Sequence, residues 1–367
     1  MKRLAAVLFA SLSLAACGGG AAPASSAPAS PPPASAKPAS AAASSASAAA
    51  KPAASASAKP AGSAAASGSA AASGLVSLKA GYPQATVTQA PIFAAVDEGL
   101  FKGNGLDVSI QMIGGPNEVP AVLANEIQFA TVGATEVANA DQKGANLVMI
   151  ATIVDLPFFW LYADKKYKTV PDLAGQTVGI TAAGSSTDSA ARLFLSHYNV
   201  LDKVKIAPAG GTQPSIYAAM SQGGIAAGIL SPPVSDQAAK AGFVSLVDGV
   251  TLGVPMNTAG ITVTRAYLKD HEDVVKRYLK AYQQGWAFVA SPTNEAEVIK
   301  VLGKYTQADA ATVEPGYRAA LKVWQGTKTP SLNPEAITNL LNLSDDPKIR
   351  AVKPTEIVDN SLLQSVQ

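Results

Sequence analysis

The chain has 367 residues, of which 28 are basic, 26 acidic, two histidine and one cysteine. A single cysteine excludes an intrachain disulfide and a cysteine-based zinc or iron–sulfur site, and two histidines argue against a multi-histidine metal site. Five of the basic residues and none of the acidic ones precede Leu75, so 23 basic and 26 acidic residues remain and that part has a formal charge of −3. This balance offers no basic face to a nucleic acid.

The first sixteen residues have the pattern of a secretory signal. A basic start at residues 1–3 precedes an apolar run from Leu4 to Ala16, which is shorter than the roughly 20 residues that a membrane-spanning helix needs. The run ends in Leu-Ala-Ala-Cys at residues 14–17, which resembles the bacterial lipobox and implies a diacylglyceryl group on Cys17. We predict a lipoprotein signal peptide at 1–16; the alternative is an ordinary cleavage site followed by a chance cysteine.

Residues 18–74 consist almost entirely of Ala, Ser, Pro and Gly, with Lys37, Lys51 and Lys59 as their only charges. Such a segment cannot bury enough apolar surface to offset the entropy lost on ordering. We predict that residues 17–74 form a lipidated cysteine and a disordered tether, whose ends lie roughly 40 Å apart as a flexible coil. A cell-wall-embedded spacer without a specific role would have the same composition.

Strand-like and helix-like segments alternate from Leu75 onward. Three strands are expected first, each followed by a helix, at 76–81 and 90–101, at 106–113 and 118–124, and at 127–132 and 135–143. The pattern returns with pairs at 177–181 and 187–198, at 205–208 and 214–222, and at 225–230 and 234–241. This alternation predicts parallel sheets with helices on both faces.

The two stretches also match in register. Ile127 precedes Gly144 by as many positions as Ile225 precedes Gly242, which favours two α/β lobes of similar build. Short β-rich runs at 159–163 and 260–264 are expected to carry the chain across and back, so lobe one takes 75–163 and 260–367 and lobe two takes 164–259. Long helical patterns follow at 271–290, 294–302 and 308–323. Two crossings leave a cleft that can close on a ligand by hinge motion.

Four runs carry a family resemblance, namely PIFAAVDEGLFKGNGLDV at 91–108, DLAGQTVG at 172–179, GSSTD at 184–188 and LSPP at 230–233. They resemble the nitrate/sulfonate/taurine-type solute-binding proteins of ABC importers, a family that includes binders of thiamine-pyrimidine precursors. The resemblance covers 75–367. It implies an α/β periplasmic-binding-protein fold with two lobes joined by two hinge strands, extra C-terminal helices on lobe one, and no catalysis. Gln128 and Ala226 depart from it, because the family often has Asp at those places.

Ligands of open parallel sheets bind beyond the carboxyl ends of the strands. Six loops occupy such places, at 82–89, 114–117, 133–136, 183–188, 210–213 and 231–233. The candidate ligand-binding residues in or near these loops are Thr88, Gln89, Gly115, Asn117, Thr135, Phe158, Gly184, Ser186, Thr187, Gly211, Thr212 and Ser231. Asn117 could instead cap a helix, and Phe158 could instead belong to the core beside the hinge.

The loop at 183–188 gives the sharpest assignment. Glycine allows close approach of the backbone, and the free N–H groups and dipole of a helix start attract negative charge. Ser185 and Asp188 have the spacing of a capping box, so we predict that they are structural and that Ser186 and Thr187 face the ligand.

The six loops contain no Lys or Arg, but they contain Glu136 and Asp188, and Glu118 follows one of them. These acids are either counter-charges to a ligand or only favourable residues at helix N-termini. The ligand classes left open are a sulfonate, a carboxylate, an amine and an N-heterocycle.

The sequence therefore predicts a monomeric lipoprotein that captures a small molecule for an ABC permease, without a cofactor, a metal or a nucleic-acid partner. The anchor would place it on the cell membrane, in the periplasm or on the outer cell surface. One alternative is a sensory lipoprotein of the same fold. The other is an enzyme of the thiamine-pyrimidine-synthase type, but that resemblance requires a metal site and a cysteine-rich segment that the sequence lacks.

Overall fold

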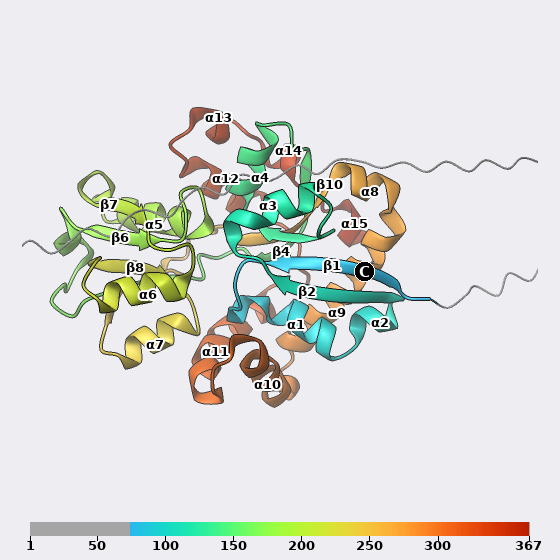
Figure 1. Cartoon of the computed structure of the whole chain (residues 1–367), viewed down its shortest axis with the longest axis horizontal. Coiled ribbons are helices and arrows are strands. Elements are labelled where there is room, and N and C mark those ends of the chain that lie inside the picture. The colour runs from blue at the N-terminus through green and yellow to red at the C-terminus, as the bar shows by residue number, and fades with distance from the viewer. Residues whose placement is uncertain (1–73, 367) are drawn as a thin grey trace, which may run out of the picture. The chain divides into compact units, whose positions relative to one another are not determined.

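The computed structural model describes residues 74–366 (Figure 1). The predicted signal peptide, Cys17 and nearly all of the predicted tether lie outside these residues. Among residues 74–366, no helix combines the length and the apolar character that a membrane crossing requires.

The first sheet contains the strands of the first α/β repeats. β1 (Val76–Tyr82) pairs in parallel with β2 (Leu106–Met112). Its other edge meets the start of β3 (Ala130–Val132), where the Gly81 N–H donates to the Phe129 carbonyl at 2.8 Å. β3 and β4 (Leu147–Val154) both pair antiparallel with β10 (Ala259–Thr264). A single parallel bridge between Ala80 and Phe129 thus joins the pair β1-β2 to the three strands β3-β10-β4, and the strands lie in the order β2-β1-β3-β10-β4.

The second sheet repeats this plan. Its order is β7-β6-β8-β5-β9, formed by β5 (Trp160–Ala163), β6 (Thr177–Ile180), β7 (Lys205–Pro208), β8 (Ala227–Leu230) and β9 (Val244–Asp248). β6 is parallel to β7 and β8, and β5 is antiparallel to both β8 and β9. In each sheet the fourth strand is antiparallel, so the prediction of two α/β lobes of similar build is confirmed.

The crossings differ from the prediction. We expected 159–163 and 260–264 to be crossing strands and lobe one to end at residue 163. β5 instead pairs with β8 and β9 inside the second sheet, and β10 pairs with β3 and β4 inside the first. The crossings are residues 155–159 and 249–258, which lie side by side. The Thr258 N–H donates to the Val154 carbonyl at 3.1 Å, and the Gly249 N–H donates to the Phe159 carbonyl at 2.9 Å.

The helices of the repeats follow the predicted order. They are α1 (Ala90–Asp97), α2 (Leu100–Gly103), α3 (Gly115–Leu123), α4 (Ala134–Asp141), α5 (Ser186–His197), α6 (Gln213–Ser221) and α7 (Val234–Lys240). The single helix expected at 90–101 is divided, because Gly99 adopts a φ of 67° between α1 and α2. Short 3-10 turns occur at Val87–Gln89, Val170–Leu173, Leu201–Lys203, Val250–Leu252 and Pro292–Asn294.

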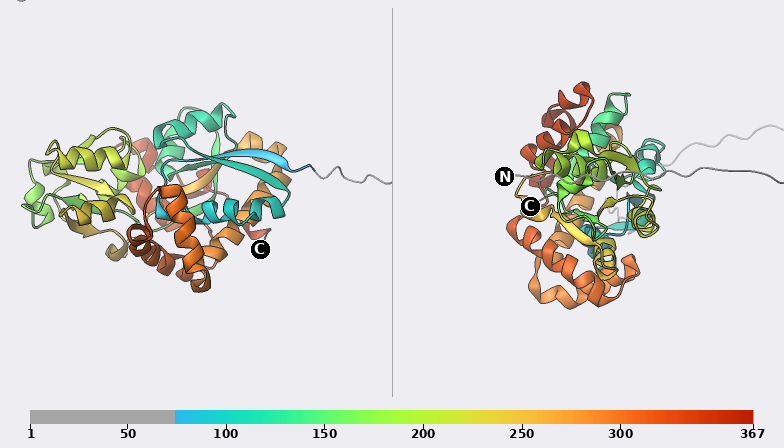
Figure 2. Two further views of the ribbon diagram at one scale, coloured as in Figure 1. Left: turned by 60° about the horizontal axis from the view of Figure 1, so that its bottom comes forward. Right: turned by 90° about the vertical axis from the view of Figure 1, so that its left-hand side faces the viewer.

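The C-terminal third is helical. It contains α8 (Arg265–Asp270), α9 (Glu272–Ala290), α10 (Glu295–Thr306), α11 (Ala310–Gly326), α12 (Pro334–Asn342), α13 (Pro347–Arg350), α14 (Pro354–Ile357) and α15 (Ser361–Gln364). In the left view of Figure 2 these orange and red helices gather around the first sheet. α11 also reaches α7 beside the second sheet, because the Lys240 Nζ donates to the Thr312 Oγ1.

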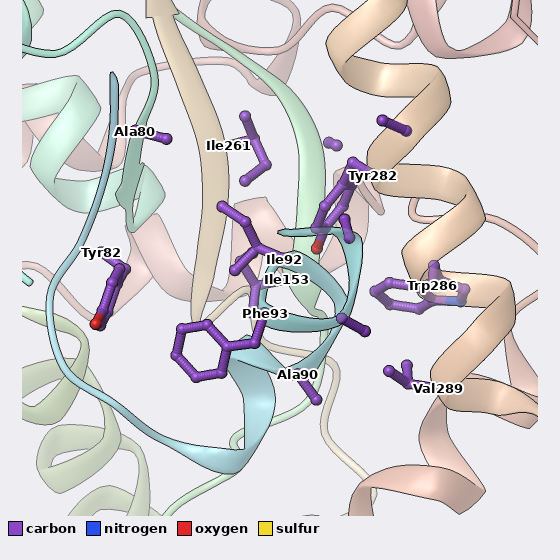
Figure 3. Close-up of a cluster of buried hydrophobic side chains, with 14 of the residues drawn as sticks. Ala80, Tyr82, Ala90, Ile92, Phe93, Ile153, Ile261, Tyr282, Trp286 and Val289 are labelled. Atoms are coloured by element: carbon purple, nitrogen blue, oxygen red, sulfur yellow. The ribbon is translucent and has the colours of Figure 1, made fainter. Parts of the chain in front are cut away.

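Large buried side chains lie where α1 packs on α9. Figure 3 shows Tyr282 and Trp286 of α9 beside α1, whereas the Phe93 ring of α1 points away from α9, toward Tyr82. Ile92, Phe93, Tyr282 and Trp286 are each 2% exposed or less. Gly285 lets the two helices approach closely, since a Cβ there would collide with the carbonyl oxygen of Pro91.

We therefore expect Gly285→Ala to lower the free energy of unfolding by about 1–3 kcal/mol through overpacking. Gly326→Ala is the control, because a Cβ at the end of α11 meets nothing within 4 Å. It is expected to leave stability unchanged or slightly raised. Urea unfolding of the two variants measures the difference, and equal effects would contradict this account of the contact between α1 and α9.

Candidate functional site

A cavity of about 90 Å³ lies where loops from both sheets meet the crossings. The carboxyl ends of β1, β3, β6 and β8 lead into these loops, which is where open α/β sheets bind ligands. The first sheet contributes Pro83, Gln84, Thr86, Thr88, Gln89, Gly115, Thr131 and Glu136, and the second contributes Thr181, Ser185, Ser186, Thr187, Gly211, Gln213 and Ser231. Ile153, Phe158, Phe159, Thr258 and Ala259 complete the wall at and beside the crossings.

The structure brings eight of the twelve predicted site residues to this cavity. They are Thr88, Gln89, Gly115, Phe158, Ser186, Thr187, Gly211 and Ser231. Their location agrees with the loops chosen from the sequence, while their contact with a ligand stays a prediction.

Four predicted residues lie elsewhere. Asn117 is exposed, because α3 begins at Gly115, three residues before the predicted start, and turns this side chain outward. Thr212 is the N-cap of α6 and accepts the Ser215 N–H at 3.3 Å. Gly184 lines a wider groove beside the cavity. Thr135 is buried in α4 outside the cavity wall.

Several residues of the cavity wall are not among the predicted ligand-binding residues. Thr131 and Thr181 occupy strand ends, and Thr258 lies in the return crossing. Gln213 is buried and shapes the loop after β8, since its Oε1 accepts the Ser231 N–H at 2.6 Å and its Nε2 donates to the Ser231 Oγ at 3.0 Å. The position of Thr131 and Thr181 at strand ends was a signal that the sequence offered; the placement of Thr258 depends on the crossing.

Ser185 is the N-cap of α5 as predicted, but Asp188 does not complete a capping box, because it accepts the Gly184 N–H and not the Ser185 N–H. The Ser185 Oγ accepts the Asp188 N–H at 3.5 Å, and the Asp188 Oδ2 accepts the Gly184 N–H at 2.7 Å. The hydroxyl of the next residue makes its hydrogen bond outside this loop, because the Ser186 Oγ donates to the Thr258 carbonyl. The start of α5 therefore touches the return crossing directly.

The role predicted for Thr187 requires a correction. Its Oγ1 accepts the Thr181 N–H at 2.9 Å and shares hydrogen bonds with the Thr181 Oγ1 at 2.8 Å and the Ser185 Oγ at 2.9 Å. A hydroxyl has one donor and two acceptor sites, so these three bonds use its full capacity. Thr187 lines the cavity, but its hydroxyl holds the loop together.

Two carboxylates lie at the start of the first-lobe helices. Glu136 is in the cavity wall, and its Oε2 accepts the Gly133 N–H at 2.6 Å. Burial raises the pKa of Glu136 to about 7, against the opposing effect of that hydrogen bond. Glu118 lies fully buried in α3, and burial raises the pKa of Glu118 well above its usual range, with the charge of Glu136 adding to the effect.

Two wall residues carry buried polar atoms without a partner. The Gln89 Oε1 and the Thr131 Oγ1 make no hydrogen bond within the described part of the chain. Their residues are 3% and 1% exposed. A buried polar group without a partner costs about 1–3 kcal/mol, so these two atoms are suited to hydrogen bonds with a bound molecule.

The two sheets, the paired crossings and a cavity lined by both sheets are the features of the generic periplasmic-binding-protein fold. A Candida albicans protein described as exhibiting that fold is 15% identical over 78% of this chain and 97% of its own, with a TM-score of 0.62. The alkanesulfonate-binding protein SsuA from Xanthomonas axonopodis pv. citri, bound to MOPS, is 19% identical over 78% and 99%, with a TM-score of 0.62. The ligand-binding component of an ABC-type import system from Staphylococcus aureus is 13% identical over 80% and 99%, with a TM-score of 0.66.

The chain belongs to the NMT1/THI5-like family, whose model matches residues 86–296. Curated protein sequences give no match.

The hydrogen bonds of Thr187 predict the effect of removing its hydroxyl. Thr187→Val should lower the free energy of unfolding by about 1–3 kcal/mol, because the Thr181 N–H loses its acceptor. Thr187→Ser retains the oxygen and should stay closer to the parent. Thermal unfolding compares the two, and a valine variant as stable as the parent would show that the hydroxyl is not structural.

Proposed function

We propose that this chain is an extracytoplasmic solute-binding lipoprotein that captures a small organic molecule in the cavity and delivers it to an ABC permease. The observation that carries the proposal is a cavity walled by both sheets in which Gln89 and Thr131 have unpartnered buried oxygens. Membership of the NMT1/THI5-like family and the likeness to ABC solute-binding proteins support a binding role. Such a role requires neither catalysis nor a cofactor.

Capture requires the walls to separate. The cavity is closed by residues from both sheets, including Gly115 and Gly211, and the Ser186 hydroxyl reaches the return crossing. Within residues 74–366 the chain passes between the sheets only at 155–159 and 249–258. Rotation about these segments would open the cavity, and a ligand that touches both walls would favour the closed arrangement.

Retention near a permease is the proposed task of the N-terminal region. A diacylglyceryl group on Cys17 would anchor a monomer to the cell membrane, since each buried acyl CH₂ contributes about 0.8 kcal/mol. The binding domain would then act in the periplasm or on the outer cell surface.

Two threonines provide a matched test of the cavity. Thr131 and Thr135 are both buried, and each has an Oγ1 without a partner, but only Thr131 lines the cavity. We expect Thr131→Val to weaken ligand binding by about tenfold to a hundredfold and Thr135→Val to leave it unchanged. The ligand is first recovered by mass spectrometry from the wild-type chain after incubation with a small-molecule cell extract, and calorimetry then compares the variants.

Equal affinities of the parent and Thr131→Val would contradict the assignment of Thr131 to the ligand. A chain that retains nothing from the extract and shows no thermal shift with it would contradict the binding function itself.

The anchor has a separate test. Cys17→Ser should abolish labelling by a radioactive fatty acid while the protein still folds and is exported, because a thiol is required for thioether formation with the lipid. Labelling is followed in the expressing cell, and circular dichroism checks folding. Label that persists in the variant would contradict lipidation at Cys17.

A further inference from the structure

Three helix starts near the cavity already carry a carboxyl group of their own. α3, α4 and α5 carry Glu118, Glu136 and Asp188 in their first turns. Each carboxylate accepts a backbone N–H, from Thr131 at 3.4 Å, from Gly133 at 2.6 Å and from Gly184 at 2.7 Å respectively. A helix start attracts negative charge through its dipole and free N–H groups. At α4 and α5 the protein's own carboxyl already accepts an N–H at that end, whereas Glu118 accepts one from β3.

The wall of the cavity contains no positively charged side chain among the described residues. Among the described residues that line it there is no Lys or Arg. Arg192 lies one turn behind Asp188, but it is paired with the Asp188 Oδ1 at 2.9 Å and the Asp345 Oδ2 at 2.6 Å. Its charge is therefore matched by two carboxylates. A negatively charged ligand would lie beside Glu136 with no compensating side chain.

Glu136 determines whether a ligand group beside it must donate or accept a hydrogen bond. Its Oε2 is engaged by Gly133, whereas its Oε1 makes no hydrogen bond within residues 74–366. Gln89 and Thr131 also lack partners, but an amide and a hydroxyl can each donate or accept. In its ionised form this carboxyl only accepts, so it favours a ligand that donates, and a positively charged ligand in turn favours the ionised form.

We infer that the ligand presents N–H donors and no negative charge to this cavity, as an ammonium, amidinium or amide group does. This inference rests on the proposed binding function and narrows it. It separates this chain from the structural neighbour described as alkanesulfonate-binding, which is only 19% identical.

Three probes of nearly equal shape test the charge. Acetate, acetamide and acetamidine differ mainly in charge and donor number, and methanesulfonate adds a second anion. Binding to the purified full-length chain is measured by saturation-transfer NMR and by thermal shift at millimolar concentration. We expect acetamidine to bind at least about tenfold more tightly than acetate or methanesulfonate, since like charges in a closed site repel strongly. Acetamide should lie between them.

Two variants test whether Glu136 causes the preference for acetamidine over acetate. Glu136→Gln should remove most of the advantage of acetamidine over acetate while changing acetamide little. Glu335→Gln, which alters an exposed first-turn glutamate in α12, is the matched control and should change nothing.

The outcomes separate the two proposals. An anion that binds more tightly than acetamidine, and whose binding is weakened in Thr131→Val, would overturn the inference about charge and leave the binding function intact. An advantage of acetamidine that persists in Glu136→Gln would overturn the role of Glu136. Failure of all four probes to bind to a chain that does retain a molecule from the cell extract would overturn the inference and leave the binding function intact. A chain that retains nothing from the extract would contradict the proposed function.

Discussion

The chain crosses between its two sheets twice, and the strand that follows each crossing lies between two other strands of the sheet that it joins. β5 enters between β8 and β9, and β10 enters between β3 and β4. Both strands run antiparallel to their neighbours, because each begins at the end of the sheet that faces the other lobe. Neither lobe can therefore form its complete sheet without the crossings, and this dependence fixes where the loops of the two lobes meet.

A buried polar cluster holds the first crossing in place. Asp155 accepts hydrogen bonds from the Thr152 Oγ1 at 2.8 Å, the Asn257 Nδ2 at 3.0 Å and the Asn333 N–H at 2.9 Å. Burial raises the pKa of Asp155, and these three donors oppose that effect. The cluster joins both crossings to the segment before α12, so the C-terminal helices support the junction. Residues at the crossings form one part of the cavity wall, and separate loops of the two sheets form the rest.

Much of this arrangement could be predicted from the sequence, because each α/β repeat carries its own local periodicity. β4 was missed, since its eight buried residues show no alternation and an apolar run of this kind does not distinguish a strand from a buried helix. α12 was missed although Asn333 and Pro334 are a typical N-cap and first-turn pair. The loops of the site were predictable because they follow strands.

The details of the site depended on long-range contacts instead. No local pattern shows that the Thr187 hydroxyl is used by Thr181, or that Thr258 of the return crossing meets Ser186. The position of Asn117 changed because α3 begins at a glycine–proline pair three residues earlier than expected. The succession of strands and helices in the repeats therefore followed from local sequence, whereas the strand order and the hydrogen-bond partners at the site did not.

Hydrogen–deuterium exchange tests the central claim most directly, namely that one ligand is held by loops from both sheets. The full-length chain is compared with and without the small molecule that it retains from a cell extract. We expect slower exchange of amides on both walls at once, at residues 131–136 and at 181–187, with little change on the outer face of α10. Slower exchange confined to one wall, or located away from both, would contradict it.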